Sequence, residues 1–200
     1  MNDGTLFYWF MWMGWVFITF LMPRSGKRNG LGITFLLGIM LSGYSISFSI
    51  GSVNMAFLFF LCIGFFYVVQ HSIQLLYYLS ACFIVATSYV AIELFALYDP
   101  VKFIIEKKYL FIVVLVVILM LLSKRKNDLF FVPLIGLFIG DALYQILIYR
   151  LNGYLEIGSM YVLDLLVSSS MILLFMVVLV DMFKKIRRLT FKKVNSAKQI

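Results

Sequence analysis

Three acidic residues interrupt apolar stretches of this chain, and their chemistry is the first functional clue. Asp141, Glu93 and Asp164 each have apolar residues on both sides. An ionisable side chain at the centre of a membrane helix costs roughly 2.5 to 3.5 kcal/mol to insert, so such residues are functional candidates by default. We therefore predict that Asp141 binds a proton or a cation and that Glu93 and Asp164 act as secondary acids.

Further polar residues favour one shared cavity. From the predicted outer helix ends, the rise per residue places Glu93 and Asp164 roughly 7 to 8 Å deep and Asp141 roughly 12 Å deep. Each acid has a polar neighbour four residues away on its own helix face. Serines three and seven residues after Ser42 form a further stripe. These features predict a polar cavity that opens outward and is lined by Ser42, Ser45, Tyr144 and Gln145.

A purely structural role is the alternative for the same residues. Buried acids can be protonated and hydrogen-bonded between helices, and serine hydroxyls commonly bond back to the preceding turn. Arg150 is a potential partner of Glu156 or of Asp164 near the membrane surface. In that arrangement Asp164 is an ion-pair partner and not a site.

The composition predicts that these acids lie in a membrane protein. Of the 200 residues, 64% are hydrophobic and 13% are charged, against about 45 to 50% and about 25% in soluble domains. We predict an all-α, polytopic bundle of seven transmembrane helices. The helices fall roughly at Thr5–Met22, Leu31–Ile50, Val53–Val69, Ile73–Tyr98, Tyr109–Leu122, Leu129–Tyr149 and Ser159–Asp181.

The turn between the third and fourth helices carries the chain's single histidine, His71. One helix over the whole apolar stretch 53–98 would be about 69 Å long, more than twice the thickness of a hydrocarbon core. A turn must therefore fall near its polar centre. His71 is expected to cap helix ends there, and a proton relay is the alternative because histidine titrates near neutral pH.

Positive charge sets the predicted orientation. Most lysines and arginines fall on one side if the N-terminus lies outside and the C-terminus lies in the cytoplasm. Residues 1–183 then form the transmembrane domain and residues 184–200 a basic cytoplasmic tail. The net charge of +8 lies in short segments and not in a stripe, which argues against nucleic-acid binding. The tail residues expected to bind anionic lipid headgroups are Lys184, Lys185, Arg187 and Arg188.

The remaining residues argue against an enzyme. With one histidine and scattered acids, the sequence offers no nucleophile or metal constellation and implies no cofactor. Our leading hypothesis is therefore a small carrier of a solute, ion or proton, or a membrane ligand-binding component. The alternative is an accessory or scaffolding protein that binds another membrane protein or a second copy. Gly136 and Gly140 form a small-residue pair suited to such an interface or to packing within the bundle.

Several features together resemble a known family. The first predicted helix contains Tyr-Trp-Phe-Met-Trp-Met-Gly-Trp at residues 8–15, short-looped apolar helices are predicted after it, and a basic tail follows them. This arrangement resembles the small uncharacterised YphA-type membrane proteins of Gram-positive, spore-forming bacteria. The resemblance implies a multi-pass protein of a bacterial cell membrane and implies no particular activity.

Overall fold

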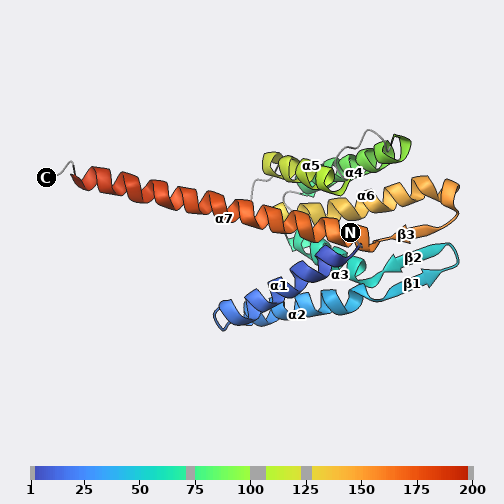
Figure 1. Cartoon of the computed structure of the whole chain (residues 1–200), viewed down its shortest axis with the longest axis horizontal. Helices are drawn as coiled ribbons and strands as arrows, with labels where there is room; N and C mark the ends of the chain where they lie inside the picture. Colours follow the sequence, from blue (N-terminus) through green and yellow to red (C-terminus); the bar gives the residue numbers. More distant parts are fainter. Residues whose placement is uncertain (1–2, 71–74, 100–106, 123–127, 198–200) are drawn as a thin grey trace.

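The structure, a computed structural model, describes residues 3–70, 75–99, 107–122 and 128–197. These residues form a helical bundle with a small three-stranded sheet at one end (Figure 1). The seven helices are α1 (Thr5–Leu21), α2 (Gly26–Ser42), α3 (Met55–Gln70), α4 (Leu75–Tyr98), α5 (Lys107–Leu122), α6 (Asp128–Asn152) and α7 (Met160–Ala197). The strands are β1 (Ser45–Phe48), β2 (Gly51–Asn54) and β3 (Leu155–Ile157).

Each apolar segment predicted to be helical contains a helix. Not every one of these helices is long and apolar enough to cross a membrane. Within the described residues, three helical segments are long and apolar enough to cross a membrane: Leu76–Tyr98, Asp128–Asn152 and Met160–Lys185. Thr5–Leu21 and Met55–Gln70 are apolar but shorter. Seven crossings and the outward N-terminus therefore stay predictions.

The prediction for the second helix is wrong at both ends. We expected a helix over Leu31–Ile50, but α2 begins at Gly26, where the Ser25 hydroxyl caps it by accepting a hydrogen bond from the Arg28 amide at 3.3 Å. The helix ends at Ser42 and the chain turns into β1. Residues 44–50 alternate apolar and serine side chains, which is the period of a strand. An all-α fold class is thus incomplete.

The sheet has two chemically different faces. Strand β2 pairs antiparallel with β1 and parallel with β3. Because opposed residues in a sheet point to the same side, Ile46, Val53 and Ile157 share one face. The other face carries polar residues from all three strands: Ser45, Ser47, Ser52, Asn54 and Glu156.

Helix α6 lies in the middle of the bundle and contacts α3, α4, α5, α7 and β3. Its closest neighbour is α4, because Gly136 and Gly140 leave no side chain between the two backbones. A Cβ built on Gly136 would meet Val85 at 2.6 Å, and one on Gly140 would meet the Ala86 backbone at 3.1 Å. The glycine pair is therefore used for packing within one chain, one of the two roles predicted for it.

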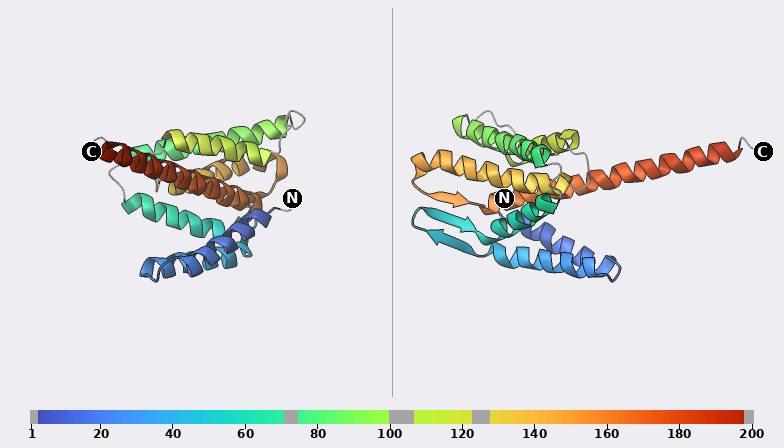
Figure 2. Two further views of the ribbon diagram at one scale, coloured as in Figure 1. Left: turned by 60° about the vertical axis from the view of Figure 1, so that its left-hand side comes forward. Right: turned by 180° about the vertical axis from the view of Figure 1, so that it is seen from behind.

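The first and last helices extend the bundle in different ways. Helices α1 and α2 form an antiparallel hairpin on one flank, with α1 against α7 and α2 against α3 (Figures 1 and 2). The C-terminal part of α7 projects beyond all other helices. The helix thus runs without a break through the predicted boundary between residues 183 and 184.

Candidate functional site

A polar cavity of about 690 Å³ lies at the end of the bundle where α4 and α6 end and α5 and α7 begin. This is the end opposite to the projecting C-terminus (Figure 1). Its walls contain four acidic side chains, two lysines and four tyrosines. The full set is Asp3, Tyr89, Glu93, Lys107, Lys108, Tyr109, Asp141, Tyr144, Gln145, Glu156, Ser159, Met160 and Tyr161.

Asp141 lies in the cavity wall and is 1% exposed. Its Oδ2 accepts a hydrogen bond from the Gly158 amide at 2.7 Å, and its Oδ1 accepts one from the Tyr89 hydroxyl at 3.3 Å. Neither donor carries a positive charge, and Asp141 makes no ion pair within the described residues. Each carboxylate oxygen has two lone pairs, so both retain the capacity for another donor.

Gly158 is required at this position for two reasons. Its φ of +74° lies in the left-handed region, and a Cβ on it would fall 2.5 Å from the Phe57 ring. A residue with a side chain would be strained and would push the amide away from Asp141. The short β3–α7 connection thus positions the only backbone donor that Asp141 has in the described structure.

Glu93 also lines the cavity, but the charge of its carboxylate is balanced by Lys107. It is 3% exposed, and its Oε2 lies 2.8 Å from the Lys107 ammonium. The same ammonium lies 4.9 Å from the centroid of the Tyr161 ring, within the range of a cation–π contact. Lys107 is therefore held by a carboxylate and an aromatic face together.

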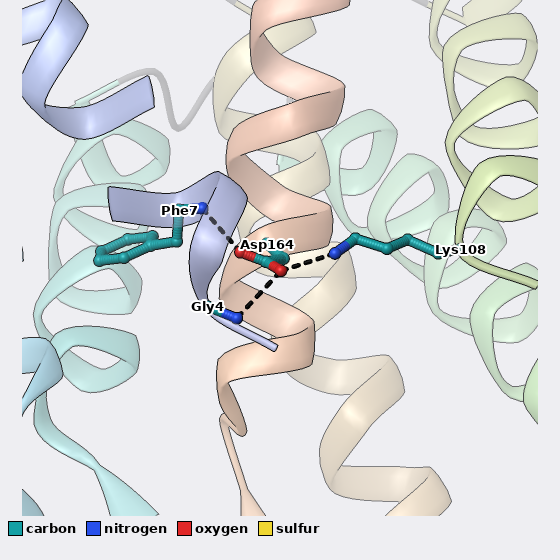
Figure 3. Close-up of polar contacts among 4 residues, drawn as sticks. All are labelled: Gly4, Phe7, Lys108 and Asp164. Carbon is teal, nitrogen blue, oxygen red and sulfur yellow. Dashed lines mark hydrogen bonds and ion pairs between the residues drawn. The ribbon is translucent and has the colours of Figure 1, made fainter. Parts of the chain in front are cut away.

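Asp164 has a different, structural environment (Figure 3). It is fully buried and does not line the cavity. Its oxygens accept hydrogen bonds from the amides of Gly4 at 3.0 Å and Phe7 at 2.6 Å, and the Lys108 ammonium lies 2.6 Å away. These two amides lie at the start of α1, where no backbone carbonyl of the helix can accept from them. Asp164 therefore caps α1 from α7. Asp164 is thus an ion-pair partner, as in the structural alternative, but its partner is Lys108 and not Arg150.

The other candidate residues divide into two groups. Tyr144 and Gln145 line the cavity beside Asp141, as predicted. Ser42 and Ser45 do not, because the helix that was to align them ends at Ser42. The buried Ser42 hydroxyl instead donates to the Ile39 carbonyl and can accept from the Tyr8 hydroxyl, while Ser45 is exposed on β1. His71 lies outside the described residues.

A fourth buried acid, Asp128, lies at the start of α6, away from the cavity. Asp128 is fully buried and accepts hydrogen bonds from the hydroxyls of Tyr78 at 2.8 Å and Tyr67 at 3.4 Å. In the sequence, Asp128 adjoins the basic residues 124–126, so it does not interrupt an apolar stretch as the other three acids do. Its place in the first turn of a helix, where an acid is favourable, was the signal that could have identified Asp128.

The two lysines were also visible in the sequence but were not assigned to the site. Lys107 and Lys108 contradict the predicted charge distribution, since they would lie outside. In the structure they are the counterions of Glu93 and Asp164. Two lysines on the side where few positive charges are expected were therefore a signal that they have a function or pair with acids.

The predicted headgroup-binding residues lie on the projecting part of α7. Lys184, Lys185 and Arg187 are exposed there, as binding to a membrane surface would require. The side chain of Arg188 lies outside the described part of the chain. Within that part, no group of three or more metal-ligating side chains comes together.

The comparisons with known proteins agree on a family. The model of a family described as YphA-like integral membrane protein matches residues 3–200. A relative from Bacillus subtilis (strain 168), whose title is "Uncharacterized protein YphA", is 29% identical over 169 residues, which cover 84% of each chain. No solved structure matches.

Proposed function

We propose that this chain, which belongs to the YphA-like integral membrane protein family, binds a small cationic or proton-exchanging solute in the cavity at Asp141. The protein is then a carrier of that solute or the ligand-binding component of a membrane system. The observation that carries the proposal is the Asp141 carboxylate, which is buried in a cavity wall without an ion pair in the described structure.

The charges of the cavity support a cation over an anion. Glu93 is neutralised by Lys107, and Lys108 is engaged with Asp164 behind the wall. Asp3, Asp141 and Glu156 remain without a cationic partner among the described residues. Burial penalises an isolated carboxylate unless it takes up a proton or a counterion. A proton or a cationic solute would meet that need.

The proposal is tested with the full-length protein reconstituted into liposomes on a solid-supported membrane. We expect currents when the concentration of H⁺, Na⁺, K⁺ or a small amine is raised on one side, and we expect Asp141→Asn to lack them. Asp128→Asn is the matched control, since it removes a buried acid from the same helix outside the cavity. The carrier role is wrong if no such jump gives a current, and the role of Asp141 in it is wrong if Asp141→Asn conducts like the parent protein.

A further inference from the structure

The ligand class of the cavity is indicated by an ammonium group that the protein itself places there. On the α5 side, the Lys107 Nζ lies 2.8 Å from a Glu93 oxygen and 4.9 Å from the Tyr161 ring centroid. A carboxylate and an aromatic face are the two groups that bind an ammonium most effectively in proteins. This half of the cavity is a filled ammonium site.

The α6 side of the cavity repeats the same chemistry without a lysine. The Asp141 carboxylate lies in the wall together with Tyr89 and Tyr144, whose rings meet edge to face with centroids 6.2 Å apart. Asp141 is fixed by hydrogen bonds from two different elements, the α4 tyrosine hydroxyl and the Gly158 amide. Its orientation is therefore set before a ligand arrives, which lowers the ordering cost of binding.

Neither cavity lysine supplies the missing cation. Lys107 is bound to Glu93, and Lys108 is bound to Asp164, which lies behind the wall and is fully buried. Moving Lys108 to Asp141 would leave Asp164 as an uncompensated buried charge, at a cost of several kcal/mol. Among the described lining residues, neither lysine is therefore available to Asp141.

We propose that the Asp141 half of the cavity binds a small primary ammonium compound, with the ammonium between the Asp141 carboxylate and the Tyr144 face and the organic part in the rest of the cavity. The inference rests on the proposed function and specifies its ligand. A primary ammonium has three N–H donors, and two of them can use the one remaining lone pair on each Asp141 oxygen. The cavity volume of about 690 Å³ lies within the usual range for small-molecule sites.

The experiment measures ligand-dependent thermal stabilisation of the purified full chain in lipid nanodiscs. The probes are propylammonium chloride, the neutral analogue 1-propanol, the anion propionate, and the chlorides of Na⁺ and K⁺. We expect saturable stabilisation by propylammonium, little by the neutral analogue and none by the anion. Asp141→Asn should weaken the apparent affinity for propylammonium by about 100-fold, because the ammonium loses its buried counter-charge.

Two variants separate the ligand contacts from an effect on folding. Tyr144→Leu removes the aromatic face and should weaken propylammonium binding by about two- to fivefold. Tyr144→Phe keeps that face and should bind like the parent. Asp128→Asn, outside the cavity, controls for the loss of a buried acid.

The possible outcomes distinguish this inference from the proposed function. If Na⁺ or K⁺ stabilises the protein through Asp141 and propylammonium does not, the cation site stands and the ammonium assignment is wrong. If propylammonium and 1-propanol act alike, binding is apolar and the assignment also fails. If no probe binds, or if binding is unchanged in Asp141→Asn, both the inference and the proposed function are wrong.

Discussion

Replacing Asp164 with asparagine should destabilise the bundle far more than replacing any exposed acid. In the parent protein the carboxylate joins three helices, since it caps the start of α1 from α7 and neutralises Lys108 on α5 (Figure 3). Asparagine keeps one oxygen for one amide, but its NH₂ group then faces the remaining donors. The Lys108 ammonium, whose side chain is 11% exposed, is left without its partner.

The expected loss follows from the broken ion pair. Removing one member of a buried pair costs about 3 to 5 kcal/mol, and the weakened helix cap adds about 1 kcal/mol. For a chain of this length that corresponds to a fall in melting temperature on the order of 10 °C. The assay is thermal or SDS-induced unfolding of the purified protein in micelles, with Asp3→Asn as the exposed-acid control.

A double-mutant cycle tests the physical reason and not only the loss. Lys108→Met alone leaves Asp164 with two amide donors, so it should cost less than Asp164→Asn. Combining both substitutions should cost about 1 to 3 kcal/mol less than the sum of the single losses, because the two side chains contact each other. Strictly additive losses, or a loss below about 1 kcal/mol in Asp164→Asn, would refute this role for Asp164.

Three other perturbations give equally specific expectations. Gly136→Ala should lower stability by about 1 to 3 kcal/mol in the same unfolding assay because its Cβ would meet Val85, whereas Gly32→Ala, which has open space, should be neutral or stabilising; equal effects of the two would contradict the close α4–α6 contact. Tyr78→Phe should cost about 1 to 3 kcal/mol through the lost hydrogen bond to buried Asp128, and Tyr109→Phe, at an exposed ring, serves as its control. Replacing Lys184, Lys185 and Arg187 together with glutamine should weaken binding of the purified protein to anionic over neutral lipid in native mass spectrometry by about 1 kcal/mol per charge, and unchanged lipid preference would rule out headgroup binding by the tail.

The helices and the central acids were predictable because their signals are local. Long apolar stretches indicate helices, and an acidic residue inside such a stretch is easy to recognise in the sequence. The hypothesis of an outward-opening polar cavity covered seven residues, and the structure places four of them in one cavity wall: Glu93, Asp141, Tyr144 and Gln145. Asp164, Ser42 and Ser45 lie outside that wall.

The partners of these acids were not predictable, because they come from distant segments. Asp164 binds amides 157 and 160 residues away, and Tyr89 reaches Asp141 across 52 residues. No spacing rule within one helix reports such contacts. Each depends on how the helices pack, which the apolar pattern alone does not specify.

The error at Ser45 has a more specific cause. Serines at 42, 45 and 49 fit a helical stripe, but the alternation over residues 44–50 fits a strand equally well. The strand β1 pairs antiparallel with β2, and β2 in turn pairs with β3, about 100 residues later. The sequence contained both patterns, and the pairing of β1 in this sheet decides for the strand.

The most direct test of a cation site at Asp141 is the charge preference of thiol labelling in the cavity. A single cysteine at Gln145, introduced into a background with Cys62→Ser and Cys82→Ala, would be reacted with cationic and anionic methanethiosulfonate reagents of similar size. We expect the cationic reagent to react about tenfold faster or more, and Asp141→Asn to reduce that ratio toward the value for free thiols. Equal rates for the two reagents, or a ratio unchanged in Asp141→Asn, would contradict a cation-binding cavity centred on Asp141.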